Sequence, residues 1–496
     1  MSKIIKTFLI LILIGAAIFG GQKAVQKLVL ENYPKTIEIV LGEPVVSLSP
    51  YTFTVNNNQM LRNIYEPLVR LDSSMNIKPS LAVSFGRIDD LTWEFRLTPN
   101  ALFHSGLPLT TASVQHSFNE LKKIANSQSL TDSIQEIQII DDYNFRIKTA
   151  YSDPILLNKL ALIPIIPSKN IEGLTESPDG TGPFIYKNHS EQTYTLVKND
   201  NYYGRAPKFQ ELKFTAIPDR EYRVQYANLN PDAALIAPFP NGLTPVLDEN
   251  RFNLVRYPNL SVNFFLFNFR TSVFDNLELR QLLTKSLTDE NLRELTDEIG
   301  HPTDQFVSSG VLGFDASLNI EKLQARELEL AVKNQGFFGT EFNIALPEGL
   351  EVFRDFLDDY WFEAGLRPEI AMLPLNELTE GSTLAQYDLI FLGWKSDFGG
   401  ASQFIQSFAL PNSEFNLGDY SNEQVNQLAE SIKQELDLQT RRDLLAETMK
   451  ILTQDDPMGI PLFESEVLFA VNKKFKYTPR ADGLIDVKNL KPKLAN

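Results

Sequence analysis

The sequence predicts an α/β fold with more than one lobe, and three observations support this prediction. The chain has 496 residues, 43% of them hydrophobic, and is longer than a single hydrophobic core usually grows. Segments that alternate between apolar and polar residues, typical of strands, are interleaved with segments of helical spacing along the whole chain. No internal repeat and no Gly/Ser-rich or Pro-rich linker separates them, so we expect short crossing strands to join the lobes.

The folded body is expected to begin near Lys35, after a short helical spacer. A first strand at 35–44 is ended by Gly42 and Pro44. The remaining elements follow from their spacing. Alternation predicts strands at 91–97, 143–149, 211–217, 251–257 and 263–269, and helical periodicity predicts helices at 110–124, 276–288, 349–365 and 421–452.

The N-terminus has the layout of a secretory signal, because Lys3 and Lys6 precede an apolar run from Thr7 to Gly21. A cleavage site is poorly marked, since Ile18 or Gln22 stands where a small side chain is preferred. We therefore expect an uncleaved membrane anchor. Lysines before the apolar run place the body outside the cytoplasm.

Composition excludes several classes of function. The chain carries 46 Lys+Arg against 63 Asp+Glu, a net charge of -17, which would repel a nucleic-acid backbone. It has no cysteine, which rules out disulfides, thiolate metal sites, a Cys nucleophile and lipid attachment through Cys. None of its four His is spaced as a metal-binding pair on a helix. We expect no nucleic-acid partner, no metal and no cofactor.

The common catalytic motifs are also missing. GTGPF at 180–184 lacks the downstream helix that would present amides to a phosphate, and no Gly-x-Ser-x-Gly elbow is present. The adjacent acids Asp141 and Asp142 point apart on a strand or helix. His104, before a predicted turn, is expected to make a structural hydrogen bond. We therefore expect a protein that is not an enzyme.

Four long segments, in order, resemble the extracellular solute-binding proteins of family 5, which serve peptide and nickel ABC importers. The first contains YEPL, LTWEFRL and FHSGLPLT, and the second runs from GTGPF into a YYG step. The third has an FNF strand followed by an FDNLELRQ helix, and the fourth has a GW strand end and a YSNEQ helix start. These segments span 63–119, 180–219, 262–292 and 387–463.

The resemblance implies a two-lobed α/β fold of the periplasmic-binding-protein kind (type II, cluster C) with a hinged ligand cleft. It places a signal or anchor with a spacer at 1–34 and lobe II at 262–461. Lobe I, with the extra subdomain of peptide-binding relatives, would be 35–261 completed by 462–496. The implied function is an extracytoplasmic, monomeric receptor that takes a peptide or related organic solute to ABC permease subunits.

The resemblance also suggests ligand-binding residues. In peptide-binding relatives, an acid in a DP pair after the GW step holds the ligand's α-ammonium, but this chain has Gly400 and Ala401 there. Asp397 is the acid that could substitute. The full set of candidates by position is Tyr51, Tyr65, Asn268, Trp394, Asp397 and Phe398.

Two alternatives stay open because the DP acid is missing. The chain could bind a non-peptide solute such as a sugar, a metal chelate or a nucleoside. It could instead act as a membrane-tethered sensor or chaperone that uses the same closure of its lobes.

Overall fold

The computed structural model describes residues 34–493 apart from 125–126, 170–172, 297–298 and 380–384. The expected anchor and spacer therefore lie outside the described residues up to position 33. Within the described part, no helix combines the length and the apolar character needed to span a membrane.

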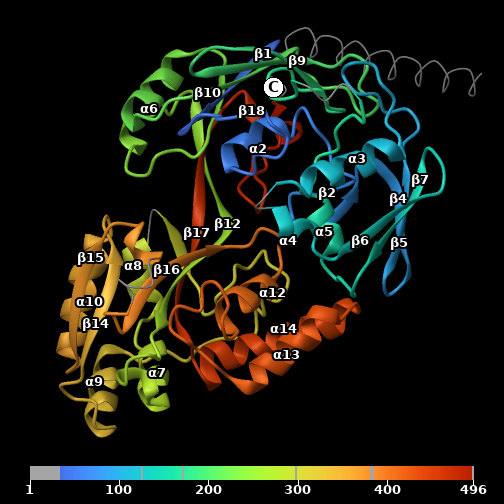
Figure 1. Ribbon diagram of the computed structural model, residues 1–496. Helices are drawn as coiled ribbons and strands as arrows, with labels where there is room; N and C mark the ends of the chain where they lie inside the picture. The colour runs from blue at the N-terminus through green and yellow to red at the C-terminus, as the bar shows by residue number, and fades with distance from the viewer. Residues whose placement is uncertain (1–33, 125–126, 170–172, 297–298, 380–384, 494–496) are drawn as a thin grey trace, which may run out of the picture.

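The predicted α/β class is confirmed by a large mixed sheet of 11 strands (Figure 1). Its strands run in the order β15-β14-β16-β12-β17-β11-β1-β10-β9-β8, and β13 pairs with β17. Their bounds are β1 Thr36–Leu41, β8 Phe184–His189, β9 Thr193–Lys198, β10 Glu211–Ala216, β11 Ala233–Ile236, β12 Phe252–Phe267, β13 Gly300–Pro302, β14 Glu341–Pro347, β15 Arg367–Leu373, β16 Leu389–Lys395 and β17 Gly459–Asn472.

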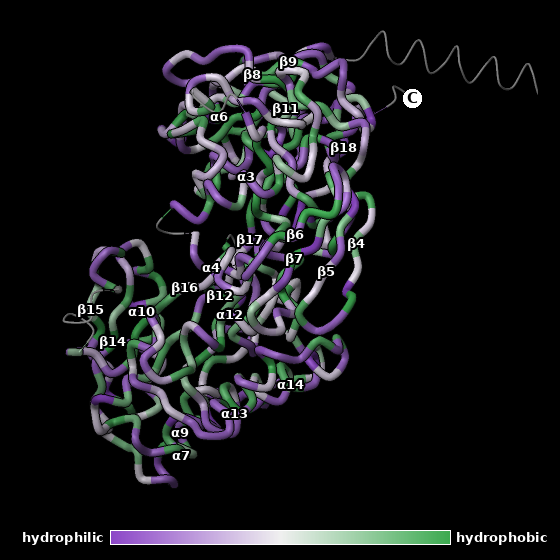
Figure 2. Tube along the Cα trace, turned by 45° about the vertical axis from the view of Figure 1, so that its right-hand side comes forward, coloured by the Kyte–Doolittle hydropathy of each residue, from purple (hydrophilic) through white to green (hydrophobic). Residues whose placement is uncertain are grey.

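The strands β12 and β17 connect an upper and a lower part of the molecule, as two views show (Figures 1 and 2). They pair antiparallel from Phe252 with Asn472 to Leu266 with Gly459. At the lower end, β12 also pairs with β16, and at the upper end β17 pairs with β11. The crossing strands expected from the absence of a linker are therefore present.

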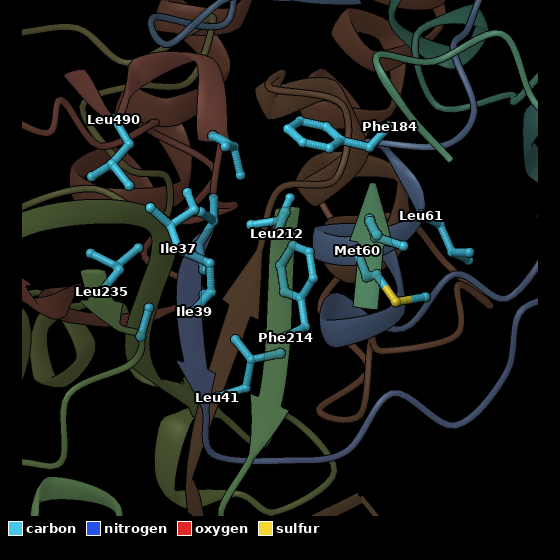
Figure 3. Close-up of a cluster of buried hydrophobic side chains, with 14 of the residues drawn as sticks. Ile37, Ile39, Leu41, Met60, Leu61, Phe184, Leu212, Phe214, Leu235 and Leu490 are labelled. Carbon is cyan, nitrogen blue, oxygen red and sulfur yellow. The ribbon is translucent and has the colours of Figure 1, made fainter. Parts of the chain in front are cut away.

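Alternation along the strands explains how one sheet separates several cores. Ile37, Ile39 and Leu41 of β1 point into one core of the upper part, shown in Figure 3, whereas Val40 points into another. In the lower part, Phe264 of β12 faces one core and Phe265 faces the opposite one. Both faces of the sheet are buried, so these strands carry continuous apolar runs.

A smaller sheet forms a subdomain beside the upper part. It has four strands in the order β4-β5-β7-β6, and its core includes Phe95, Phe118 and Phe145. Its strands are β4 Ala82–Asp89, β5 Thr92–Leu97, β6 Ile134–Ile139 and β7 Asn144–Thr149. Two further sheets of two strands each pair β2 Val69–Leu71 with β3 Ile77–Pro79 and β18 Phe475–Lys476 with β19 Lys491–Pro492.

Helices pack against the sheets in both parts of the molecule. Those of the upper part and subdomain are α2 Val55–Leu61, α3 Thr111–Leu121, α4 Gln128–Thr131, α5 Leu156–Leu160 and α6 Arg220–Leu229. Those of the lower part are α7 Leu277–Thr284, α8 Asp289–Thr296, α9 Ala325–Asn334, α10 Glu351–Glu363, α12 Ala401–Phe404, α13 Glu423–Gln434 and α14 Leu438–Lys450.

The predicted extents are wrong in two places. The strands expected at 251–257 and 263–269 are one strand, β12, whose register shifts between Pro258 and Val262 and whose Leu260 has a φ of 63°. A bulge at this point lets the pairing of β12 with β17 continue although the apolar-polar alternation of the sequence is interrupted. The helix expected at 421–452 is two helices, because Asp437 caps a second one by accepting from the backbone N–H of Thr440 at 2.8 Å.

An ion-pair cluster between β13 and β17 predicts that the stability of the protein depends on pH. His301 lies 3.2 Å from the buried Glu464 and 3.6 Å from Glu466, and its hydrogen bond to Glu464 raises its pKa. A raised folded pKa contributes stability that is fully present below about pH 6.5, the unfolded value, and is lost as pH rises through the folded value. We expect the melting temperature to fall as the pH rises from about 6.5 through the raised pKa of His301.

The matched variant is His301→Gln, whose melting temperature should fall less over the same interval. Equal pH slopes for the two proteins would contradict this role for His301.

Candidate functional site

A cavity of about 390 Å³ lies where the upper part, the subdomain and the end of β16 meet. Its volume is within the range of small-molecule sites. The walls come from the segment that contains α2, from β2 and the turn before β3, from α4 and the end of α5, from 395–398 after β16, and from the C-terminal segment 480–488. Segments far apart in the chain therefore build one site.

Much of the wall is apolar. The apolar lining side chains include Phe53, Val55, Leu61, Leu71, Met75, Leu130, Leu162, Phe398 and Leu484. Phe398 is only 8% exposed and packs with the core of the subdomain, and its carbonyl oxygen accepts a 2.7 Å hydrogen bond from Asn158 Nδ2. The loop after β16 is thereby held against the subdomain.

Charged groups of both signs interrupt this apolar wall. The cationic ones are Arg62, Arg70, Lys395, Arg480 and Lys488, and the acidic ones are Glu66, Asp397, Asp482 and Asp486. Such convergent polar groups fix the orientation of a ligand that the apolar wall binds.

The best-paired of these groups is Arg480. Its Nε lies 2.9 Å from Asp482 Oδ1, and its Nη1 donates to the carbonyl oxygen of Leu71 at 2.7 Å. Burial opposes the charge on Arg480, but the hydrogen bonds and charge of Asp482 outweigh it and raise the pKa of Arg480. Lys395 Nζ donates to the carbonyl oxygen of Asp482 at 2.8 Å, and burial lowers the pKa of Lys395.

Glu66 is a buried acid in the same wall. It accepts from Tyr202 Oη at 2.7 Å and from Thr181 Oγ1 at 3.3 Å. Burial raises the pKa of Glu66 despite these bonds and the charge of Lys488. Both bonding partners come from segments that brace the end of α2 and the YEPL step.

The GTGPF motif belongs to this brace. Gly182 N–H donates to the carbonyl oxygen of Ile64 at 2.7 Å. His104 Nε2 donates to the carbonyl oxygen of Gly182 at 3.0 Å. The structural hydrogen bond expected for His104 is therefore confirmed. A Cβ on Gly180 would lie 2.0 Å from the carbonyl oxygen of Ile64. Glycine is needed here because two backbones touch.

Gly180→Ala is therefore expected to destabilise the protein by about 1–3 kcal/mol, because Ile64 and Tyr65 must move away from the new methyl group. Chemical denaturation measures the change. The control is Gly86→Ala, where the added Cβ meets nothing within 4 Å. A loss at position 180 no greater than that at position 86 would show that the contact is not tight.

Of the six predicted ligand-binding residues, three line the cavity. Tyr65 is 3% exposed in the upper wall, and Asp397 and Phe398 lie on the loop after β16. The exposed Asp397 accepts from Gln403 Nε2 of the following helix α12 at 3.1 Å. Whether these residues contact a ligand stays a prediction.

The other three lie in packed surroundings outside the cavity lining. Tyr51 donates from its hydroxyl to the carbonyl oxygen of Ser117 at 2.9 Å. Asn268 is fully buried and donates to the carbonyl oxygen of Tyr387 at 2.8 Å, which supports the turn after β12. Trp394 packs edge-on against Phe404 in the lower core, with ring centroids 5.3 Å apart. A ligand role for these three also stays a prediction.

Sequence reasoning missed the cationic residues of the cavity. Arg62 stands three residues before Tyr65, the first residue of the YEPL step, and Arg480 and Lys488 lie in the C-terminal segment, which has no motif. The only signal was the proximity of Arg62 to YEPL. Among the described residues, no three His, Cys, Asp or Glu side chains gather as a metal site.

A family model described as "Bacterial extracellular solute-binding proteins, family 5 Middle" matches residues 76–416. The curated relatives include the protein described as "Probable D,D-dipeptide-binding periplasmic protein DdpA" of Escherichia coli K12, which is 23% identical over 468 residues, 88% of each chain. They also include the glutathione-binding protein GsiB of Salmonella paratyphi A, 22% identical over 471 residues, 88% of this chain and 91% of that one.

Solved structures share the fold along the chain. HbpA2 of Haemophilus parasuis superposes with a TM-score of 0.83 at 20% identity, covering 92% of this chain and 100% of the other. The murein tripeptide binding protein MppA in its unliganded open form gives 0.80 at 17% identity, covering 92% and 97%. At these identities the likeness shows the fold, and it confirms the periplasmic-binding-protein-like architecture.

Proposed function

Because this chain belongs to the bacterial extracellular solute-binding proteins of family 5, we propose that it captures a peptide or related organic solute for an ABC importer. The family consists of solute-binding proteins that work outside the cytoplasm with ABC permeases. The observation that supports this function best is the cavity of about 390 Å³ between segments of the upper part, the subdomain and the β16 loop. Relatives named for a D,D-dipeptide and for glutathione support a peptide-like ligand.

The proposed mechanism is closure of two lobes around the ligand. Lobe I would comprise 35–261 and 462–496, and lobe II 262–461. Their boundaries fall inside β12 and β17, where the register of β12 shifts between Pro258 and Val262. A ligand that touches Tyr65 on one side and Phe398 on the other would bind the closed state better and shift the population toward it.

Two further features belong to this proposal. The protein would act as a monomer, as the resemblance to the family implies. The lysines and apolar run at the N-terminus would tether it to the membrane, in keeping with an extracytoplasmic receptor.

The first test identifies the ligand. The full-length chain is purified and denatured, and released small molecules are identified by mass spectrometry. Thermal stability is then measured with di- and tripeptides and with separate sugar and nucleoside panels, because a ligand of the folded state raises stability. Released or stabilising peptides are expected. Stabilisation by sugars or nucleosides alone would favour the non-peptide receptor, and no ligand at all would favour the sensor or chaperone.

The proposal of a peptide ligand also makes a prediction for Asp397. If its exposed carboxylate holds a ligand ammonium, Asp397→Asn should weaken binding of peptides with a free amino terminus about tenfold. Isothermal titration of the same peptides in N-acetylated form provides the control, since these lack the ammonium and should bind both proteins equally. Unchanged affinity for the free peptides would remove Asp397 from the site.

A further inference from the structure

A two-stranded ribbon near the C-terminus carries four lysines on one face. Its strands β18 and β19 pair antiparallel, with Lys476 directly opposite Lys491. The backbone N–H of Lys493 donates to the carbonyl oxygen of Lys474 at 2.7 Å, which extends the pairing by one rung. Side chains alternate between the two faces of a strand, so these four exposed lysines share the outer face. On the inner face, Phe475 is 4% exposed and belongs to the core of the upper part.

This lysine face has no counter-charge within the described part of the chain, since none of its four ammonium groups pairs there with a carboxylate. The acids of the same C-terminal segment, Asp482 and Asp486, line the cavity instead. Like charges directly opposite each other on neighbouring strands destabilise the pairing. An anionic partner that covers the lysine face would relieve this repulsion. The positive charge is local, because the whole chain has a net charge of -17.

The lysine face lies close to the point where the folded body begins. Phe475 packs edge-on against Phe209, with ring centroids 6.1 Å apart, and the next residue, Gln210, donates its backbone N–H to the carbonyl oxygen of Lys35 at 2.8 Å. Two views place β18 in the upper part, at the end remote from α7 and α9 (Figures 1 and 2). Residues 22–33, between the apolar run and the body, reach at most about 40 Å when fully extended. The tether proposed above would therefore keep the lysine face within reach of the bilayer.

We infer that the lysine face docks the upper part onto the headgroups of an anionic lipid bilayer and so holds the tethered receptor in a preferred orientation. This inference goes beyond solute capture and rests on the proposed tether. Lysine is a hydrated point charge on a flexible stem, which suits mobile phosphate headgroups, and each lysine near an anionic surface favours docking about fivefold. Acids elsewhere on the body are screened, because the Debye length is about 8 Å at physiological ionic strength.

The absence of cysteine allows a single dye to be attached at a chosen position. A donor dye is placed through Thr478→Cys, at an exposed residue beside the lysine face, or through Gln335→Cys, at an exposed residue after α9. The full-length chain is reconstituted into vesicles of phosphatidylcholine, with or without phosphatidylglycerol, whose headgroups carry an acceptor dye. Energy transfer then reports the docked population. The charge variant replaces the four lysines by glutamine, and the matched control replaces four exposed lysines elsewhere by glutamine, namely Lys148, Lys285, Lys333 and Lys433.

Energy transfer from position 478 is expected to be higher in the anionic vesicles than in the neutral ones. The difference should vanish at about 1 M salt, where the Debye length is about 3 Å. In the anionic vesicles, the charge variant should lower the docked population at least about tenfold, and the matched control should keep it. Equal transfer in both lipids, transfer from position 478 no higher than from position 335, or an equal loss in the matched control would overturn the inference.

Two further measurements separate the inference from its neighbours. Flotation with neutral vesicles at high salt tests the tether alone, because the lysine face contributes nothing there. A chain that does not float lacks the tether, and flotation with anionic vesicles at low salt that depends on the four lysines would still support the lysine face. Sedimentation velocity in detergent tests for a second copy of the chain. Self-association that the charge variant abolishes would assign the face to that copy and overturn the inference. Thermal denaturation checks that both variants fold.

Discussion

Replacing Lys159 with methionine is expected to lower the free energy of unfolding by about 3–5 kcal/mol. Lys159 is 5% exposed, and its Nζ lies 2.9 Å from Asp153 Oδ2 and 2.8 Å from Asp132 Oδ1. Asp153 is itself 4% exposed. The substitution removes the cation in contact with this buried carboxylate, which keeps the hydrogen bond from Ser133 Oγ at 2.5 Å and the more distant charge of Arg441.

Chemical denaturation measures this loss, and two comparisons isolate its cause. Lys123→Met removes a lysine that pairs with Glu120 at 2.7 Å but is 66% exposed, and it should cost less than about 1 kcal/mol. The double variant Lys159→Met with Asp153→Asn should recover most of the stability, because both charges of the buried pair are then removed together. If the double variant is no more stable than Lys159→Met, lost packing and not the unpaired charge explains the effect.

The second large effect is expected for Trp361→Ala, which should cost about 3–5 kcal/mol. Trp361 lies on α10, is fully buried and packs against Phe265 of β12 and Phe342 of β14, with ring centroids 6.4 and 5.6 Å away. Its Nε1 donates to Ser286 Oγ at 3.0 Å. Truncation opens a cavity against the strand that crosses between the two parts.

The control for Trp361 is its neighbour Phe362, which is 56% exposed and has the Arg367 guanidinium 4.2 Å from its ring centroid. Phe362→Ala should change the unfolding free energy by less than about 1 kcal/mol. Similar losses for the two variants in a denaturation series would contradict the assignment of Trp361 to the core. Because β12 pairs with β16, ligand affinity should fall in Trp361→Ala as well.

Local elements were predictable where periodicity is strong. The segment 35–44 contains β1, 143–149 contains β7 and 349–365 contains α10, because alternation and helical spacing report which face of each element is buried. The two errors of extent have local causes that hydrophobicity does not report. A bulge continues β12 through Pro258–Val262, and the Asp437 cap divides the last long helical pattern.

The candidate site was only partly predictable, since position in a motif does not say where a side chain points. Trp394 of the GW step turns into the lower core, whereas Phe398, four residues later, reaches the cavity wall. Asn268 bonds a backbone carbonyl at the end of β12 and does not line the cavity.

The sequence by itself determined the fold class, the crossing strands in place of a linker, the absence of cysteine chemistry and the family, because composition, periodicity and motif order lie along the chain. Only the tertiary structure decided that GTGPF braces the YEPL step, and that Arg62 shares a wall with Arg480 and has no hydrogen-bond partner for Nη1 within the described part of the chain. The physical reason is that burial, charge balance and hydrogen-bond partners are set by residues distant in sequence. Those are the quantities that make a cavity selective for a ligand.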